Sequence, residues 1–136
     1  MKRATTIYWV FTGLAAAFML MASIPDVVQV PAAVEIFKHL GFPPYLLPFI
    51  GLAKILGVIV ILLPMFQNLK EWAYAGLVFD LIGAFYSHVS VGDRPGDWIF
   101  AIVGLLLVLI SYVLYRWKTD YGKVAHRVGK RSTIAA

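Results

Sequence analysis

Apolar residues in this chain gather into four long runs that are separated by short polar segments. The runs cover about residues 7–24, 45–63, 72–91 and 98–115, so each holds 18 to 20 residues. An α-helix rises about 1.5 Å per residue, and about 20 residues cross the hydrocarbon layer of a membrane. The pattern therefore predicts four transmembrane helices that pack together as a bundle.

A fifth segment, residues 31–40, is too short and too charged to cross a membrane. Pro31 suits the first position of a helix, and Gly41 suits the position after its end. Its apolar side consists of Ala33, Phe37 and Leu40, and its polar side of Glu35, Lys38 and His39. The expected fold class is therefore all-α: a transmembrane four-helix bundle with a short amphipathic interfacial helix between helices 1 and 2.

The first run also has the outline of a signal peptide, because Met1-Lys2-Arg3 precedes it. It is longer than the apolar part of most signal peptides, and no small-residue cleavage site follows it. We expect an uncleaved helix that ends at Ser23-Ile24-Pro25-Asp26. Tyr8 and Trp9 suit the aromatic belt at a membrane surface.

Composition supports the membrane assignment. Hydrophobic residues make up 61% of the 136 positions and charged residues only 14%, whereas about 25% of a soluble protein is charged. Mean hydropathy is +0.82. The sequence contains no cysteine, which excludes disulfides, iron–sulfur clusters and thiolate metal sites.

The net charge of +5 is explained by topology and needs no nucleic acid. With four spans, the side that carries the termini holds nine Lys and Arg residues, and the opposite side holds two, Lys38 and Arg94. Basic residues favour the cytoplasm, so we expect a multi-pass protein of the inner (plasma) membrane with both termini cytoplasmic. The predicted units are a four-span domain, 1–117, and a basic cytoplasmic tail, 118–136. The tail is expected to be largely disordered near its end and able to hold anionic lipid.

Two ionisable residues lie inside apolar runs: Lys54 in the second and Asp80 in the third. A charge at the bilayer centre costs about 2.5–3.5 kcal/mol on insertion scales, so such residues are usually paired. Because a short loop makes the two helices antiparallel, both residues fall near the membrane midplane. We predict that Lys54 and Asp80 are partners.

Other polar residues are expected at the outer end of the bundle, above this pair. They include Asp26, Gln29, Ser87, His88, Asp93 and Asp97. Small residues share their faces with the polar ones, as in Gly51-x-x-Lys54-x-x-Gly57 and in the stripe of Gly76, Asp80 and Gly83, which indicates faces turned inward. One hypothesis is a packing seam with a buried ion pair. The other is an outward-facing cleft, roofed by residues 31–40, with a binding centre at Lys54, Asp80, His88, Asp26, Gln29, Ser87 and Asp97.

Chemistry at single residues has weaker support. His88 as a haem ligand would need partners, and the other histidines, His39 and His126, are predicted elsewhere. His88 could form an outer metal site with Asp26 and Asp97, but nothing in the spacing requires one, so no metal site is expected and a hydrogen-bonded, proton-accepting His88 is favoured. Lys54 as a Schiff-base nucleophile is rarer than Lys54 in an ion pair. Ser87 and His88 are adjacent and face about 100° apart on a helix, which is poor geometry for a nucleophile pair. No catalytic residues are assigned, and the chain is expected not to be an enzyme on its own.

The sequence resembles the DoxX-like family of small four-helix membrane proteins. The resemblance is carried by Gly41-Phe42-Pro43-Pro44, by Gly51-x-x-Lys54-x-x-Gly57, and by the stretch from Glu71 through Gly76 to Ser87-His88. It implies a four-helix bundle in the inner membrane and permits a connection to quinones or redox complexes. It carries over no catalytic residues.

Three functions remain in view. The first is a binding or accessory subunit that holds a quinone or lipid in the outer cleft, associated with membrane oxidoreductases. The second is a proton- or ion-coupled transporter or channel, which would need oligomerisation at this size. The third is an assembly partner of a larger membrane complex, through homo-oligomers or contacts with other membrane subunits. A membrane enzyme that acts on a lipid-soluble substrate ranks last.

Overall fold

The computed structural model describes residues 2–135, which form five α-helices and no strand. The helices are α1 (Lys2–Val28), α2 (Pro31–His39), α3 (Leu46–Leu62), α4 (Gln67–Ser90) and α5 (Pro95–Ala135). The all-α prediction is confirmed for this range. Met1 and Ala136, the outer ends of the two predicted units, lie outside the described residues.

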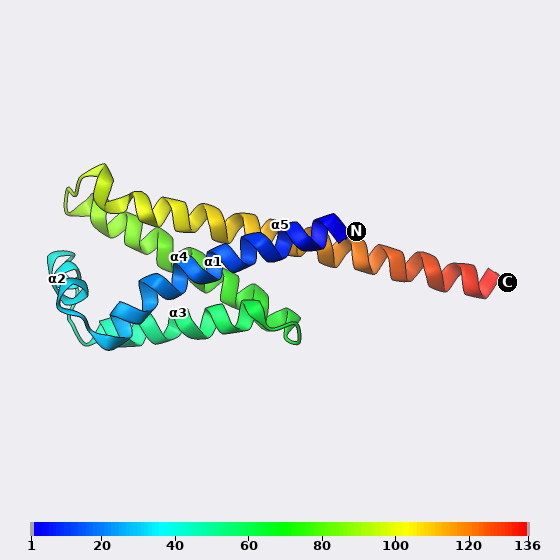
Figure 1. The fold of residues 1–136 in the computed structure, drawn as a ribbon, viewed down its shortest axis with the longest axis horizontal. Helices are drawn as coiled ribbons and strands as arrows, with labels where there is room; N and C mark the ends of the chain where they lie inside the picture. Colours follow the sequence, from blue (N-terminus) through cyan, green and yellow to red (C-terminus); the bar gives the residue numbers. More distant parts are fainter. Residues whose placement is uncertain (1, 136) are drawn as a thin grey trace.

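Four long helices form the body of the molecule. α1 packs against α3 and α5, and α4 packs against the same two helices. Figure 1 shows α2 at the end of this bundle that lies away from the termini, while α5 extends far beyond the bundle at the other end. By length and composition, α1 and α5 could each cross a membrane, and α3 is apolar but has 17 residues. The all-helical bundle is thus observed, and four membrane crossings remain a prediction.

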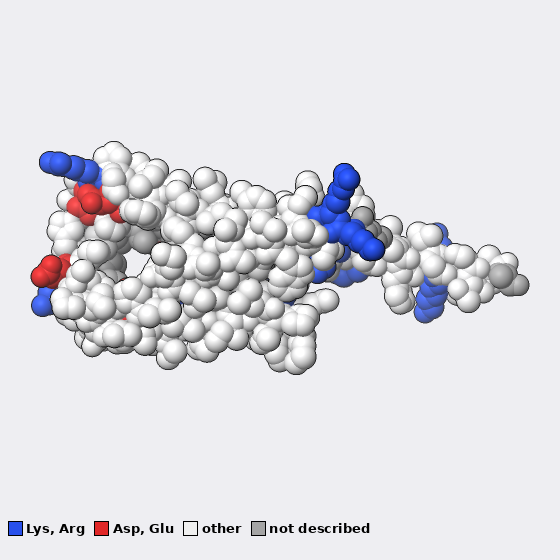
Figure 2. Space-filling model, in the orientation of Figure 1, with Lys and Arg blue, Asp and Glu red and all other residues white. Residues whose placement is uncertain are grey.

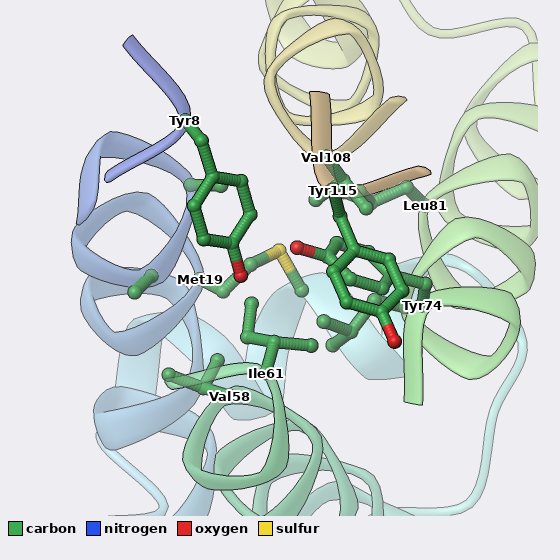
Figure 3. Packing of buried hydrophobic residues seen from close by; sticks show 11 residues of the cluster. Tyr8, Met19, Val58, Ile61, Tyr74, Leu81, Val108 and Tyr115 are labelled. Carbon is green, nitrogen blue, oxygen red and sulfur yellow. The ribbon is translucent and has the colours of Figure 1, made fainter. Parts of the chain in front are cut away.

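The core lies between all four long helices, in the half of the bundle nearer the N-terminus. Figure 3 shows Tyr8 and Met19 from α1 facing Val58 and Ile61 from α3, with Tyr74 and Tyr115 close by. Tyr8 is only 1% exposed, so its predicted place in an interfacial aromatic belt is wrong. Its neighbour Trp9 is 39% exposed. In a lipid environment such packing stabilises the bundle through dispersion contacts.

The first helix does not end at Ser23–Asp26 as predicted. α1 continues through Pro25 to Val28, and it stops at Gln29, whose φ of 57° is left-handed. Proline removes one backbone donor, but the helix can continue when neighbouring groups accommodate the loss. As a result Asp26 lies on the last turn of α1 and not in a loop.

Two other boundaries differ from the prediction. α4 begins at Gln67, five residues before the predicted span, which leaves a short turn after α3. α5 runs through the basic segment to Ala135, where the sequence favoured disorder. Residues 116–135 contain no proline, and their Lys, Arg and Ala residues favour a helix, which continues through Gly122 and Gly129.

The buried face of α4 is also different from the predicted stripe. Its buried residues are Lys70, Tyr74, Leu77 and Leu81, which recur at spacings of four and three. Gly76 and Gly83 are exposed, and a side chain added at either would meet nothing within 4 Å. The face of α4 that packs against the other helices therefore consists of large residues and not of small ones. On α3, by contrast, Gly51 is buried as expected.

Candidate functional site

Lys54 lies at the meeting point of three helices. Its Nζ donates to Asp26 Oδ2 on α1 at 2.7 Å and lies 3.9 Å from Asp80 Oδ2 on α4. The predicted pairing of Lys54 with Asp80 is therefore present, but the shorter contact is to Asp26. The contact with Asp26 is not predicted from the sequence, because Ser23-Ile24-Pro25-Asp26 is expected to end the first helix, whereas α1 continues to Val28.

Gly51 allows α3 to approach α1 at this point. A Cβ at Gly51 would lie 2.9 Å from Asp26 Cβ and from Val27 Cγ2, closer than real Cβ atoms come. Gly51 precedes Lys54 by three residues, so both are on the same side of α3. The missing side chain thus lets the ammonium of Lys54 reach a carboxylate on the neighbouring helix.

The charges of this cluster do not balance. One ammonium faces two carboxylates, and the three side chains are only 12% (Lys54), 16% (Asp26) and 25% (Asp80) exposed. A charge held away from water is costly unless it is paired and hydrogen-bonded. If both carboxylates are ionised, the cluster carries one surplus negative charge. It can therefore take up a proton or a ligand that donates hydrogen bonds.

A second polar cluster connects α2 to the end of α4. Asp93, in the turn after α4, accepts hydrogen bonds from His39 Nε2 on α2 and from His88 Nδ1 on α4, both at 2.6 Å. These two hydrogen bonds hold the pKa of Asp93 below its ordinary value of 3.8, because they stabilise the carboxylate. The bond from His39 has the larger effect and the bond from His88 the smaller one. The Asp93 side chain is 13% exposed. We call His39, Asp93 and His88 the outer clamp.

A cleft of about 520 Å³ lies between these clusters. Fifteen of its twenty lining residues are apolar, and the polar ones are Asp26, Lys54, Asp80, His88 and Asp97. One wall is formed by α2, through residues that include Ala33, Phe37 and Leu40, the predicted apolar side of that helix. Figure 2 shows the molecule hollowed at the end that carries the acidic side chains.

Five of the seven predicted site residues thus line one cleft, and two do not. Gln29 ends α1 in the left-handed conformation and is not part of the lining. Ser87 donates to the Gly83 carbonyl of its own helix. Asp97 lines the cleft and also accepts a hydrogen bond from the Arg94 backbone N–H at the start of α5, at 3.2 Å.

Sequence reasoning missed a buried polar cluster in the core. Ser111 Oγ lies 2.7 Å from Thr12 Oγ1 and 2.7 Å from Tyr74 Oη, so one hydroxyl joins three helices. Lys70 is 4% exposed, and its Nζ lies 3.5 Å from Tyr8 Oη. The spacing of Tyr8, Thr12, Ala15 and Met19 on α1, four then three then four, could have indicated this inward face.

A family model described as the DoxX-like family matches residues 10–111. Searches of curated proteins and of solved structures found no match. The matched range begins in α1 and ends in α5, so it includes the cleft and both polar clusters around it. Together with the long apolar helices, the match gives the chain the character of a membrane protein, and the chain belongs to the DoxX-like family.

Proposed function

We propose that this protein binds an apolar small molecule that carries a polar head, a quinone or a lipid, in the cleft, to which all five helices contribute lining residues. The observation that carries the proposal is the cleft itself. Its volume of about 520 Å³ suits a small-molecule site, which typically has about 300–1,000 Å³. A mostly apolar lining with a few convergent polar groups is what such a ligand needs.

The polar groups of the cleft complement the head of a quinone. An ammonium has three donors, and Lys54 uses one at 2.7 Å on Asp26, so another can meet a ligand carbonyl. His88 Nδ1 donates to Asp93 Oδ2, and in the neutral ring Nε2 can accept a hydrogen bond from a ligand hydroxyl. The surplus carboxylate beside Lys54 can accept a proton that a reduced quinone releases.

This chemistry suits an accessory subunit of a membrane redox complex more than an independent enzyme. The chain contains no cysteine, so it offers no thiol redox chemistry of its own. Its polar groups can bind, orient and exchange protons with a ligand that another subunit oxidises or reduces.

The same proposal places the protein in the inner (plasma) membrane with both termini in the cytoplasm. In Figure 2 the charged side chains in view gather at the two ends of the molecule, with a belt of uncharged side chains between them. The end that carries the termini holds most of the Lys and Arg residues, which supports a cytoplasmic location for it. The absence of cysteine makes the test simple: a single cysteine at Ser132→Cys should be labelled only from the cytoplasm, and one at Ser90→Cys only from outside.

Ligand binding is tested by native mass spectrometry of the full chain with added short-chain ubiquinone and with added phospholipid. Ala84 lines the cleft, and Ala75 is an exposed residue of the same helix. Ala84→Trp should fill the cleft and lower quinone affinity at least about tenfold, because a ligand of this kind gains most of its affinity from burial. Ala75→Trp should bind like the wild type. If the wild type binds neither compound, or if Ala84→Trp binds as well as Ala75→Trp, the proposal is wrong.

A proton-coupled transporter is the second candidate, favoured by the buried hydroxyls. The chain Thr12–Ser111–Tyr74 provides hydrogen bonds within the core, on the side of the bundle away from the cleft. These hydroxyls and the carboxylates beside Lys54 are two separate polar clusters, each made of groups that intramembrane proton relays use. Proteoliposomes that show proton flux in the wild type and none with Asp80→Asn would favour this function over simple binding.

A further inference from the structure

The end of the bundle near the termini has a pocket of its own, distinct from the cleft. Its volume is about 450 Å³, and it lies between the start of α1, the turn before α4 and the middle of α5. Tyr8, Tyr115, Lys118 and Lys123 are among its lining residues. We call it the inner pocket.

Basic side chains at this pocket have no carboxylate partner among residues 2–135. The ion pairs in this range involve Lys54, Arg116 and two histidines, and none involves Lys70, Lys118 or Lys123. The nearby carboxylate of Glu71 is committed to Arg116 Nη1 at 3.1 Å and to the Tyr112 hydroxyl at 2.8 Å. Asp120, also on α5, forms no ion pair with Lys118 or Lys123 within this range, so the lining of the pocket carries an excess of positive charge.

Aromatic rings hold two of these lysines in place. The ammonium of Lys118 lies 4.9 Å from the ring centre of Tyr8 and 5.4 Å from that of Trp9. Lys70 does not line the pocket, but it contacts two residues that do. Its Nζ lies 5.3 Å from the ring centre of Tyr115 and 3.5 Å from Tyr8 Oη, and its charge and that of Lys118 repel each other. Cation–π contacts position an ammonium but do not neutralise it. A buried lysine without an anion is costly, which points to an anionic occupant of the neighbouring pocket.

We propose that the inner pocket binds the phosphate group of an anionic phospholipid, through Lys118 and Lys123. Charge-assisted hydrogen bonds from ammonium groups to phosphate oxygens are short and strong. A phospholipid fits better than free phosphate because apolar side chains lie exposed beside Tyr8 on α1. Ile7 is 46% exposed and Val10 is 53% exposed, so acyl chains have an apolar surface to cover next to the headgroup site. At the cytoplasmic membrane surface, anionic lipid is the abundant source of phosphate oxygens.

The test compares two pairs of substitutions that remove the same charge. Lys118→Gln with Lys123→Gln alters the inner pocket, and Lys130→Gln with Arg131→Gln alters the far end of α5. The full chain is placed in nanodiscs of mixed phosphatidylglycerol and phosphatidylcholine, and the lipids that stay bound after release into the gas phase are counted by native mass spectrometry. Each basic residue near the surface contributes about 1 kcal/mol, so the pocket pair should lower the preference for phosphatidylglycerol about 30-fold. The control pair lies near the end of α5, which extends beyond the bundle and so away from the proposed headgroup site. It should therefore leave the preference within about threefold of the wild-type value.

Two results would overturn the proposal. If both pairs lower the preference equally, the lipid responds to the overall charge of α5 and not to a site. If inorganic phosphate at millimolar concentration displaces phosphatidylglycerol from the wild type, the occupant is free phosphate and not a lipid headgroup. Thermal melting of both variants checks that each is folded, and neither result depends on ligand binding in the outer cleft.

Discussion

The contacts of Lys54 rank the effects that substitutions in its cluster should have on stability. Lys54→Met leaves two carboxylates facing each other with no cation. Removing one partner of a buried ion pair costs about 3–5 kcal/mol. The three side chains are between 12% and 25% exposed, so solvent partly screens their charges. We therefore expect Lys54→Met to lower the free energy of unfolding by an amount at the lower limit, about 3 kcal/mol.

The two carboxylates should not be equivalent. Coulomb attraction falls inversely with distance, so the contact at 3.9 Å has about 0.7 of the attraction of the contact at 2.7 Å, before the hydrogen bond to Asp26 is added. Asp26→Asn should cost about 1–2 kcal/mol, because a hydrogen bond to a charged group is lost or weakened. Asp80→Asn should cost less than about 1 kcal/mol, since it also removes the surplus negative charge.

Double-mutant cycles measure these couplings directly. The free energy of unfolding is measured in mixed micelles by titration with sodium dodecyl sulfate, with tryptophan fluorescence as the signal. The coupling of Lys54 to Asp26 should be about 1–3 kcal/mol, and that of Lys54 to Asp80 should be smaller, with each double variant less destabilised than the sum of its singles. The reasoning fails if Lys54→Met is as stable as the wild type, or if the coupling to Asp80 is the larger one.

Three further predictions concern the packing and the outer clamp. Gly51→Ala should destabilise the protein by about 1–3 kcal/mol, because the added Cβ would overlap Asp26. Gly76→Ala, on an open helix surface, should be neutral or stabilising by up to about 1 kcal/mol. Chemical unfolding of both variants tests these values, and equal effects would contradict the close approach of α1 and α3. Ser111→Ala should cost about 1–3 kcal/mol, because it leaves two buried hydroxyls without their shared partner, and an unchanged free energy of unfolding would contradict the buried network. The folded-state pKa of Asp93 is lowered, so its contribution to stability is full above its unfolded pKa of about 3.8 and is lost as pH falls through the lower folded value. The melting temperature of Asp93→Asn should therefore lie below that of wild type at pH 5 to 7 and approach it in stronger acid, and a gap that widens with acid would refute the clamp.

Much of the fold was accessible from the sequence because apolar run length is a strong signal. The four runs became four long helices, and the amphipathic pattern of residues 31–40 predicted both α2 and the side that faces the cleft. The ends of the helices were less predictable. The sequence predicts that the first helix stops at Pro25, but a proline inside a helix can be tolerated when nearby groups accommodate its missing donor.

The partner of Lys54 was missed for the same reason. The loop between α3 and α4 makes Asp80 a predictable neighbour of Lys54, since a short connection forces antiparallel packing. The contact with Asp26 depends on how close α1 and α3 come, which is set by Gly51 and by the continuation of α1 beyond Pro25. Small residues do not by themselves mark a seam: Gly51 is buried against α1, whereas Gly76 is exposed.

Photoaffinity labelling tests the proposed binding site most directly. A ubiquinone analogue with a photoreactive tail is added to the wild-type protein in lipid, and labelled peptides are mapped by mass spectrometry. The proposal predicts labels on cleft residues such as Met21, Phe37 and Phe100, which come from three different helices, and competition by unlabelled ubiquinone. Labels spread over exposed apolar residues outside the cleft, such as Leu106 and Val113, without such competition, would contradict it.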